Sequence, residues 1–229
     1  MCNKFAQIVT HADGTQRWIR PNFDPPTRDF DVAVRYELMK SAVERFPKQQ
    51  IEVVYRAKSG IEKLNSFQWG LPKSGTSAVI TNTRIENIKG FWSRFSNNRV
   101  LIPITNFFEF KEESGLKKPH SIWFKDFPIA YMAGIAGSFQ PEENSDPIRW
   151  VTIITQEANS LMRQIHNHGE NRFRQPCLVR PEYWDSWLGN LNYSEDSFFQ
   201  FCKGYLSDEI SVQEIEVPGS QMGLFSNPT

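Results

Sequence analysis

The sequence predicts an α+β protein whose core is a mostly antiparallel β-sheet, curled or closed like a barrel, with peripheral helices packed outside it. Two observations lead to this prediction. From residue 51 onward most segments are short, rich in β-branched or aromatic residues and bounded by turn residues, a pattern typical of strands. Few long helical segments separate them, so successive strands are expected to pair antiparallel and the sheet to curl, which protects its edges.

Seven segments carry the strand pattern. They are Ile51–Tyr55, Ala78–Asn82, Val100–Ile104, Phe107–Lys111, Ser121–Phe124, Ile129–Ala136 and Arg149–Thr155. Apolar residues recur at four-residue steps over Phe30–Phe46 and stop at a proline, which predicts an amphipathic helix. Three more helices are expected at Glu157–His166, Pro181–Leu188 and Ser194–Leu206. Pro and Gly are spread along the chain without a linker or an internal repeat, so a single domain over residues 1–229 is expected.

The composition constrains the class of protein. No apolar run approaches the roughly 20 residues that a membrane span needs, and the first five residues resemble no targeting signal, so a cytoplasmic protein without membrane contact is expected. Three cysteines at wide spacing suit neither a disulfide framework nor a zinc site. We therefore expect free thiols, no metal and no cofactor. The formal net charge is zero, so binding to nucleic acid would need a local basic surface.

Cys2 follows the initiator methionine and is small enough for ordinary methionine removal. The processed chain would then carry an α-amine with a pKa of about 8 and a thiol with a pKa of about 8.5 on one residue. An aldehyde is the natural target of this pair, because the amine forms an imine and the thiol closes onto the same carbon to give a thiazolidine. Cysteine at this position alone is weak evidence for catalysis.

Several separated motifs add to this evidence. In order they are Met1-Cys2, Trp69-Gly70-Leu71-Pro72, Asn82-Thr83-Arg84-Ile85-Glu86, the segment Arg99–Phe110, Thr152-Ile153-Ile154-Thr155 with Ala158-Asn159, and Ile165-His166. In these motifs and their order the sequence resembles the SOS response-associated peptidase (SRAP) family, whose members link covalently to abasic DNA. The resemblance extends from Cys2 to about Leu188.

The resemblance implies a catalytic site of Cys2, Asn82, Glu109 and His166. Cys2 would be the nucleophile, and Asn82 would position the amine or the sugar hydroxyl. Aromatic neighbours would desolvate Glu109 and raise its pKa into the range of a general acid or base. His166 titrates near neutral pH and would protonate the sugar oxygen during ring opening. Without the resemblance, Glu109 is a solvent-facing strand residue, Asn82 a turn residue and His166 a helix cap.

For contacts to DNA the resemblance points to Arg84 and Trp69, with Lys4, Arg174 and Phe110 as further candidates. Guanidinium groups suit phosphate, and aromatic faces stack unpaired bases without demanding a sequence. The alternatives are that Trp69 belongs to the core and that Arg84 pairs internally with Glu86 or Glu109. Cys177 and Cys202 stand among apolar residues and are expected in the core.

The sequence departs from the family pattern at three places. Asn3-Lys4 stands where the family usually has Gly-Arg, which exchanges a planar fork for a point charge. Phe110 replaces the usual tryptophan next to the glutamate. An added polar segment, residues 167–173, separates His166 from Arg174-Gln175-Pro176 and is expected to reshape the entrance to the site.

The resulting hypothesis is a monomeric DNA-damage enzyme that cross-links abasic sites in single-stranded DNA through Cys2 and lies on the nucleoid when bound. Two alternatives stay open. One is a thiol peptidase in which Cys2 attacks a peptide carbonyl, with the chain's own Met1 as a possible substrate. The other is a non-catalytic single-stranded DNA-binding module, which would bind intact and abasic strands equally.

Overall fold

The centre of the computed structural model is a closed barrel of five strands. The structure describes residues 3–7, 42–127, 129–141, 145–189, 199–202 and 204–215. The barrel strands are β3 (Gln50–Arg56), β4 (Glu62–Trp69), β8 (Arg99–Ile104), β11 (Ala130–Phe139) and β12 (Ile148–Glu157). They follow one another in the order β11-β8-β3-β4-β12, and an antiparallel ladder between β11 and β12 closes the ring.

Alternation along each barrel strand separates two hydrophobic clusters, because successive side chains of a strand point to opposite faces. The inner cluster includes Val53, Phe67, Val100, Ile102, Met132, Val151 and Ile153. The outer cluster includes their sequence neighbours Val54, Leu101, Ala133, Trp150 and Ile154. Short helices cover this outer surface, namely the 3-10 helices η1 (Ile85–Asn87), η2 (Phe91–Phe95) and η3 (Pro181–Tyr183) and the helix α3 (Trp184–Leu188).

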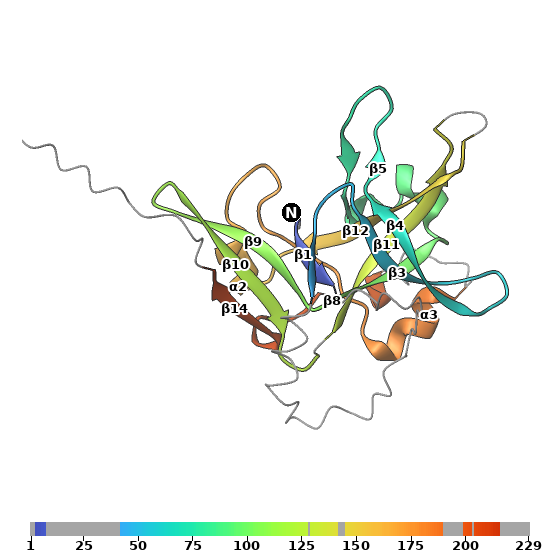
Figure 1. The fold of residues 1–229 in the computed structure, drawn as a ribbon. Helices are drawn as coiled ribbons and strands as arrows, with labels where there is room; N and C mark the ends of the chain where they lie inside the picture. The colour runs from blue at the N-terminus through green and yellow to red at the C-terminus, as the bar shows by residue number, and fades with distance from the viewer. Residues whose placement is uncertain are drawn as a thin grey trace, which may run out of the picture.

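A second sheet lies beside the barrel, with β1 between them (Figure 1). Its order is β14-β10-β9-β1-β2, made of β1 (Phe5–Gln7), β2 (Val43–Arg45), β9 (Asn106–Glu113), β10 (Leu116–Phe124) and β14 (Ile210–Glu214). The buried Gln7 ties β1 to the barrel, because its Nε2 donates to Glu52 O and Pro103 O and its Oε1 accepts from Glu52 N. The strand that follows Cys2 is therefore fixed by the barrel.

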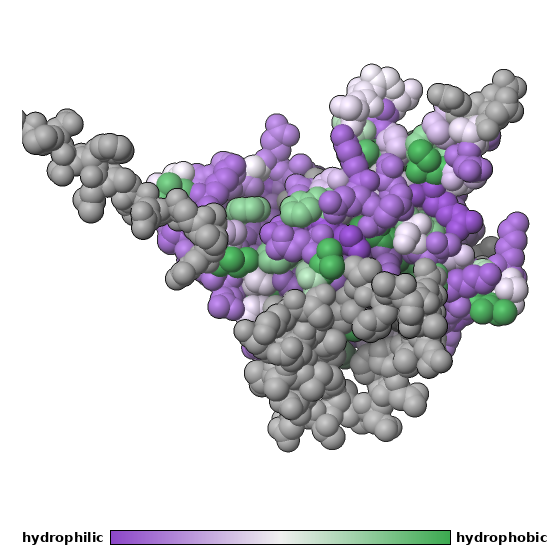
Figure 2. Space-filling model, in the orientation of Figure 1, coloured by the Kyte–Doolittle hydropathy of each residue, from purple (hydrophilic) through white to green (hydrophobic). Residues whose placement is uncertain are grey.

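The remaining elements border these two sheets. They are β5 (Leu71–Pro72) and β6 (Val79–Ile80), β7 (Asn82–Arg84) and β13 (Arg174–Pro176) beside β12, the helix α2 (Ser160–Ile165) and the 3-10 helix η4 (Ser207–Glu209). On the face drawn in Figure 2, hydrophobic residues form small separate patches among hydrophilic ones. No helix among the described residues is long and apolar enough to cross a membrane.

The predicted fold class is confirmed, and so are six of the seven predicted strands, with shifted ends. The seventh, Ala78–Asn82, is divided between β6 and the start of β7, which belong to different sheets. The predicted helix Phe30–Phe46 is wrong where the structure describes it, because residues 43–45 form β2 and pair with β1 in register Phe5↔Arg45. Its residues 30–41 lie outside the described residues. Cross-strand pairing outweighs a four-residue apolar spacing at that end. Strands β1, β4, β5, β13 and β14 were not predicted; β1, β5 and β13 have only two or three residues, and polar residues interrupt the alternation of β4.

The three other predicted helices fare differently. Pro181–Leu188 is confirmed as η3 followed by α3. The helix predicted from Glu157 begins only at Ser160, because β12 continues through Glu157 and Asn159 caps α2 by accepting from Met162 N at 2.8 Å. Of Ser194–Leu206, residues 199–201 are helical, and residues 190–198 and 203 lie outside the described residues.

Gly134 is required by the packing inside the barrel. A Cβ at this position would lie 2.9 Å from Val100 Cγ2 and 3.0 Å from Ile102 Cδ1. We expect Gly134→Val to lower the free energy of unfolding by about 1–3 kcal/mol, the usual cost of overpacking a core. Ser138→Val, on the same strand but exposed, is the control and should change it by less than about 0.5 kcal/mol. Urea denaturation measures both, and equal effects would contradict this account.

Candidate functional site

A pocket of about 340 Å³ opens beside β1 and gathers four of the predicted site residues. Glu109, His166, Lys4 and Phe110 all contribute to it. Its described lining is Asn3, Lys4, Phe46, Phe108, Glu109, Phe110, Lys117, His166 and His168. Cys2 lies outside the described residues, and Asn3, the next residue in the chain, is part of the wall.

Two backbone elements bring Glu109 and His166 together. Strand β9 carries Glu109, and Phe108 N donates to Lys4 O at 2.9 Å, which ties this part of β9 to the residues before β1. Helix α2 ends at Ile165, so that His166 is its C-terminal cap with non-helical angles. Both side chains are buried. Glu109 Oε2 lies 3.9 Å from His166 Nε2, close enough for a small movement to bring them into hydrogen-bonding distance.

The proton on His166 is assigned from its other ring nitrogen. Nδ1 lies 3.0 Å from Arg174 O and 3.3 Å from Arg174 N. Nδ1 either donates to Arg174 O or accepts from Arg174 N. The shorter contact favours donation to Arg174 O, which leaves the Arg174 N–H without this acceptor and turns the Nε2 lone pair toward Glu109.

Burial shifts the pKa of both groups in opposite directions. Desolvation raises the pKa of Glu109 to about 7 and lowers the pKa of His166 to about 4, because burial disfavours the charged form of each. The expected rise for Glu109 is therefore present. At neutral pH His166 is uncharged, whereas the sequence alone predicted a histidine that titrates there. Glu109 is thus the group of this pair that exchanges a proton near pH 7.

Asn82 lies on β7, opposite Ile153 of β12. It is buried, its Nδ2 donates to Thr81 Oγ1 at 2.9 Å, and it is not among the described residues that line the pocket. A structural link joins this strand to β1, because Trp69 Nε1 donates to Thr81 O at 3.1 Å and the Trp69 ring lies 4.7 Å from that of Phe5. Trp69 therefore links Thr81, the residue before Asn82, to Phe5 of β1.

Two of the predicted DNA contacts are buried in this structure. Trp69 has 0% exposure and belongs to the inner cluster, so its ring offers no face to a base. Arg174 is 9% exposed and makes a bidentate ion pair with Glu86 at 2.9 and 2.8 Å, with a further bond to Thr155 O. Trp69 thus belongs to the core, which was the alternative for this residue, and the side chain that pairs with Glu86 is Arg174 instead of Arg84.

Three predicted contacts keep an accessible surface. Phe110 is 46% exposed at the pocket. Lys4 Nζ pairs with Glu44 at 2.7 Å and lies 4.3 Å above the Phe108 ring, within the pocket wall. Arg84 is exposed, and its Nη2 donates to Asn171 Oδ1 at 3.1 Å.

The added segment, residues 167–173, is a loop with closed ends. Phe173 N donates to His166 O at 2.8 Å, and Phe173 adopts a φ of 62°, which is rare for a large side chain. Asn167 bonds the backbone of Glu112 twice, because its Nδ2 donates to Glu112 O and its Oδ1 accepts from Glu112 N. His168 also pairs with the Glu112 carboxylate. The loop therefore anchors His166 to the strand that carries Glu109.

Sequence reasoning missed part of the pocket wall. Lys117, Phe46 and Phe108 line it without having been predicted, and so does His168, the histidine that was set aside in favour of His166. Lys117 lies on β10 and Phe108 on β9. The predicted pairing of these two strands was the one feature of the sequence that could have placed both residues near Glu109. Among the described residues no group of three or more His, Cys, Asp or Glu side chains could hold a metal ion. Cys177 and Cys202 are buried free thiols, as expected.

Comparisons with known proteins agree on one family. The sequence profile described as "SOS response associated peptidase (SRAP)" matches residues 1–217. The abasic site processing protein YoaM of Bacillus subtilis is 26% identical over 180 residues, which cover 74% of this chain and 75% of that protein. A crystal structure from Bacteroides thetaiotaomicron shares the fold with a TM-score of 0.64 at 23% identity, over 74% and 75% of the two chains. A phage-related protein from Bordetella bronchiseptica has a TM-score of 0.64 at 18% identity, over 94% and 95%.

The raised pKa of Glu109 makes stability depend on pH. Its folded-state pKa is about 7 against a reference value of 4.5, so the folded state holds this proton more tightly and loses stability as pH rises from 4.5 through 7. Glu109→Gln lacks the charge. We expect its free energy of unfolding, relative to the unsubstituted protein, to increase by up to about 3 kcal/mol between pH 4.5 and 8.

Denaturant unfolding at a series of pH values measures this difference. Glu113→Gln is the control on the same strand, because the ion pairs of Glu113 with Lys118 and Lys111 lower its pKa to about 2. Its effect should be constant above pH 4.5. A Glu109→Gln difference that is flat over this range would contradict the burial argument.

Proposed function

Because the chain belongs to the SOS response-associated peptidase family, we propose that it processes abasic sites by forming a covalent cross-link between Cys2 and single-stranded DNA. The carrying observation is the buried pair of Glu109 and His166, 3.9 Å apart, in a pocket whose wall includes Asn3. This pair is an acid–base couple in the pocket whose wall includes the residue that follows Cys2 in the chain. The names of relatives such as YoaM, an abasic site processing protein, support the same substrate.

The chemistry has three steps. The deoxyribose ring opens at the abasic site, which exposes an aldehyde. The α-amine of Cys2, after Met1 is removed, adds to this aldehyde and loses one water to form an imine. The thiol then adds to the imine carbon while its proton moves to the nitrogen, which closes the thiazolidine ring.

The two buried side chains share the proton transfers. Ring opening needs a proton moved between the sugar hydroxyl and the ring oxygen, and loss of water needs a proton on the departing hydroxyl. Glu109, with a pKa of about 7, is present in both protonation states at neutral pH and suits both transfers. Uncharged His166 accepts a proton through Nε2 and returns it to Glu109. The sequence led us to expect that His166 protonates the sugar oxygen. In this proposal it instead passes protons to and from Glu109.

The accessible residues at the pocket hold the strand in this proposal. Phe110 offers a ring for an unpaired base, and Lys4 places a positive charge near the phosphates. Arg84 lies on the strand that carries Asn82 and reaches phosphate from outside the pocket. Asn82 orients the amine or the sugar hydroxyl through its amide.

A cross-linking assay tests the proposal. The protein lacking Met1 is incubated with an abasic single-stranded oligonucleotide, and heat-stable adducts are resolved on a denaturing gel. We expect an adduct with the unsubstituted protein, none with Cys2→Ala, and a rate about 100-fold lower with Glu109→Gln, the common size of a general acid–base contribution. The rate should pass through a maximum near pH 7, because Glu109 is used in both protonation states.

Cys177→Ala and Cys202→Ala are the matched controls, since both thiols are buried. They should form the adduct at the unsubstituted rate whenever they fold. An adduct that survives Cys2→Ala would overturn the proposal, as would equal retention of intact and abasic strands without any adduct.

Substitution of the two arginines near Glu86 should have different effects, one on DNA binding and the other on the stability of the fold. Arg84→Ala removes an exposed cation, so we expect DNA affinity to fall with little change in melting temperature. The slope of log affinity against log salt concentration should become shallower by about 1, as for the loss of one phosphate contact. Arg174→Ala removes a buried guanidinium that pairs with the half-exposed Glu86 and leaves the Thr155 carbonyl without this donor, so we expect a loss of about 1–3 kcal/mol in unfolding free energy. Fluorescence anisotropy and thermal unfolding measure the two effects, and the reverse assignment would contradict the structure.

A further inference from the structure

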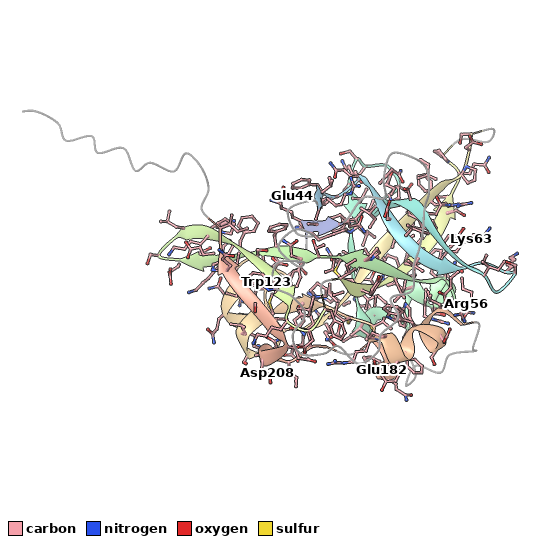
Figure 3. The ribbon with its side chains drawn as sticks, turned by 60° about the horizontal axis from the view of Figure 1, so that its bottom comes forward. Glu44, Arg56, Lys63, Trp123, Glu182 and Asp208 are labelled. Carbon is pink, nitrogen blue, oxygen red and sulfur yellow. The ribbon has the colours of Figure 1, made fainter. Side chains whose placement is uncertain are left out.

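The barrel has a second pocket, at the mouth away from the Glu109 site. It has a volume of about 470 Å³ and is formed where β3 ends, β8 begins, β11 nears its end and β12 begins. Figure 3 shows Arg56 at this end, where the β3–β4 hairpin meets α3. Its described lining shares no residue with the pocket that contains Glu109 and His166. Mouths of β-barrels are common places for small-molecule sites.

The inner face of β12 changes character at this mouth. Ile153 and Val151 point into the apolar interior, and by strand alternation Arg149 points the same way. Its guanidinium lies 5.8 Å from the centroid of the buried Phe67 ring, which confirms the direction. An arginine therefore occupies the inward position at which the apolar interior of the barrel ends.

The charges around this mouth are positive. Four basic residues, Arg56, Lys58, Arg99 and Arg149, are part of the lining, and no carboxylate is among the described lining residues. Arg56 is neutralised by Glu62 and Asp185, each at 2.6 Å. Arg99 is buried and donates to the backbone carbonyls of Trp187, Ser96 and Gly189. Lys58 and Arg149 are exposed cations that face the open volume and are available to an anion.

The rest of the lining suits a flat ring. Tyr55 and Phe67 lie on the same inner face with ring centroids 5.7 Å apart, and the small side chains of Ala136 and Ser138 leave space opposite them. Asn97 and Asn98 add side-chain amides at the rim, which can both donate and accept hydrogen bonds. A volume of this size lies within the range of pockets that hold drug-sized ligands.

We propose that this barrel mouth binds one nucleotide, with its phosphate at Arg149 and Lys58 and its base against Tyr55 and the edge of Phe67. The shared chemistry is a nucleoside phosphate, supplied either as a free nucleotide or as one residue of a DNA strand. Arginine binds phosphate through paired N–H donors, and an aromatic face holds any base. The amides of Asn97 and Asn98 reach the polar edge of the base.

Isothermal titration of the full chain with deoxyadenosine 5′-monophosphate tests this assignment at low salt. We expect saturable binding, weakened at least about tenfold in Arg149→Ala and in Lys58→Ala, as for a lost charge-assisted hydrogen bond. Ser138→Trp should also weaken binding, because the new side chain fills the mouth. Arg94→Ala is the matched control, since Arg94 is likewise stacked on a phenylalanine, Phe91, at 4.6 Å but lies on η2 outside this pocket. Its affinity should stay within about twofold of the unsubstituted chain.

Two further titrations identify which part of the ligand the pocket recognises and whether it comes from a free nucleotide or from a DNA strand. Inorganic phosphate should bind much more weakly than the nucleotide, and equal affinity would overturn the role of the aromatic wall. An intact single-stranded oligonucleotide that displaces the nucleotide, and fails to do so in Arg149→Ala, indicates a strand as the source, whereas no displacement indicates a free nucleotide.

Absence of saturable binding to the unsubstituted chain, or unchanged affinity in Arg149→Ala and Ser138→Trp, would overturn the inference. The cross-linking assay with Cys2 uses the other pocket, so its outcome is independent of this one. The exposed positions of Lys58, Ser138 and Arg149 keep the fold intact in these variants, which thermal unfolding verifies.

Discussion

The ladder between β11 and β12 is the constraint on which the rest of the structure depends. Because these strands pair along six residues of each, from Gly134↔Ile153 to Phe139↔Ile148, the sheet has a closed interior and two mouths instead of two open edges. Closure forces strict alternation, so one set of side chains fills the interior and the other set supports the short helices outside. It also fixes β12 as the strand against which β4, β7 and β13 align.

From this frame the site geometry follows through a few polar anchors. Gln7 bonds the backbone of β3 and β8, and Trp69 joins Phe5 to Thr81. The N-terminal strand is thereby held between the barrel and β9, with Glu109 on its far side. The Glu109 carboxyl is buried as a consequence of this arrangement, and its burial raises its pKa. The same packing that holds the strands together therefore desolvates this acid.

The sequence alone could predict the class of fold and most strands, since alternation and turn residues are local signals. It could also predict the convergence of Glu109 and His166, through the resemblance rather than through spacing. It could not decide whether Trp69 is enclosed, and it could not predict that Arg174 pairs with Glu86, because both depend on which strands meet β12. It could not predict the uncharged state of His166, since desolvation is set by neighbours distant in the chain. Strand β2 was hidden by a four-residue apolar spacing that tertiary pairing overrides.

A hydrogen bond joins the two ends of the loop after His166, so the length of the loop does not affect the geometry of the site. Since His166 O and Phe173 N are joined, residues between them can change in number at a small entropic cost, about 0.6 kcal/mol for each doubling. The base of the loop then sets the position of the His166 imidazole, while the tip of the loop can vary in sequence and length. Changes in the length or sequence of this loop can therefore alter the rim of the pocket and leave its floor unchanged.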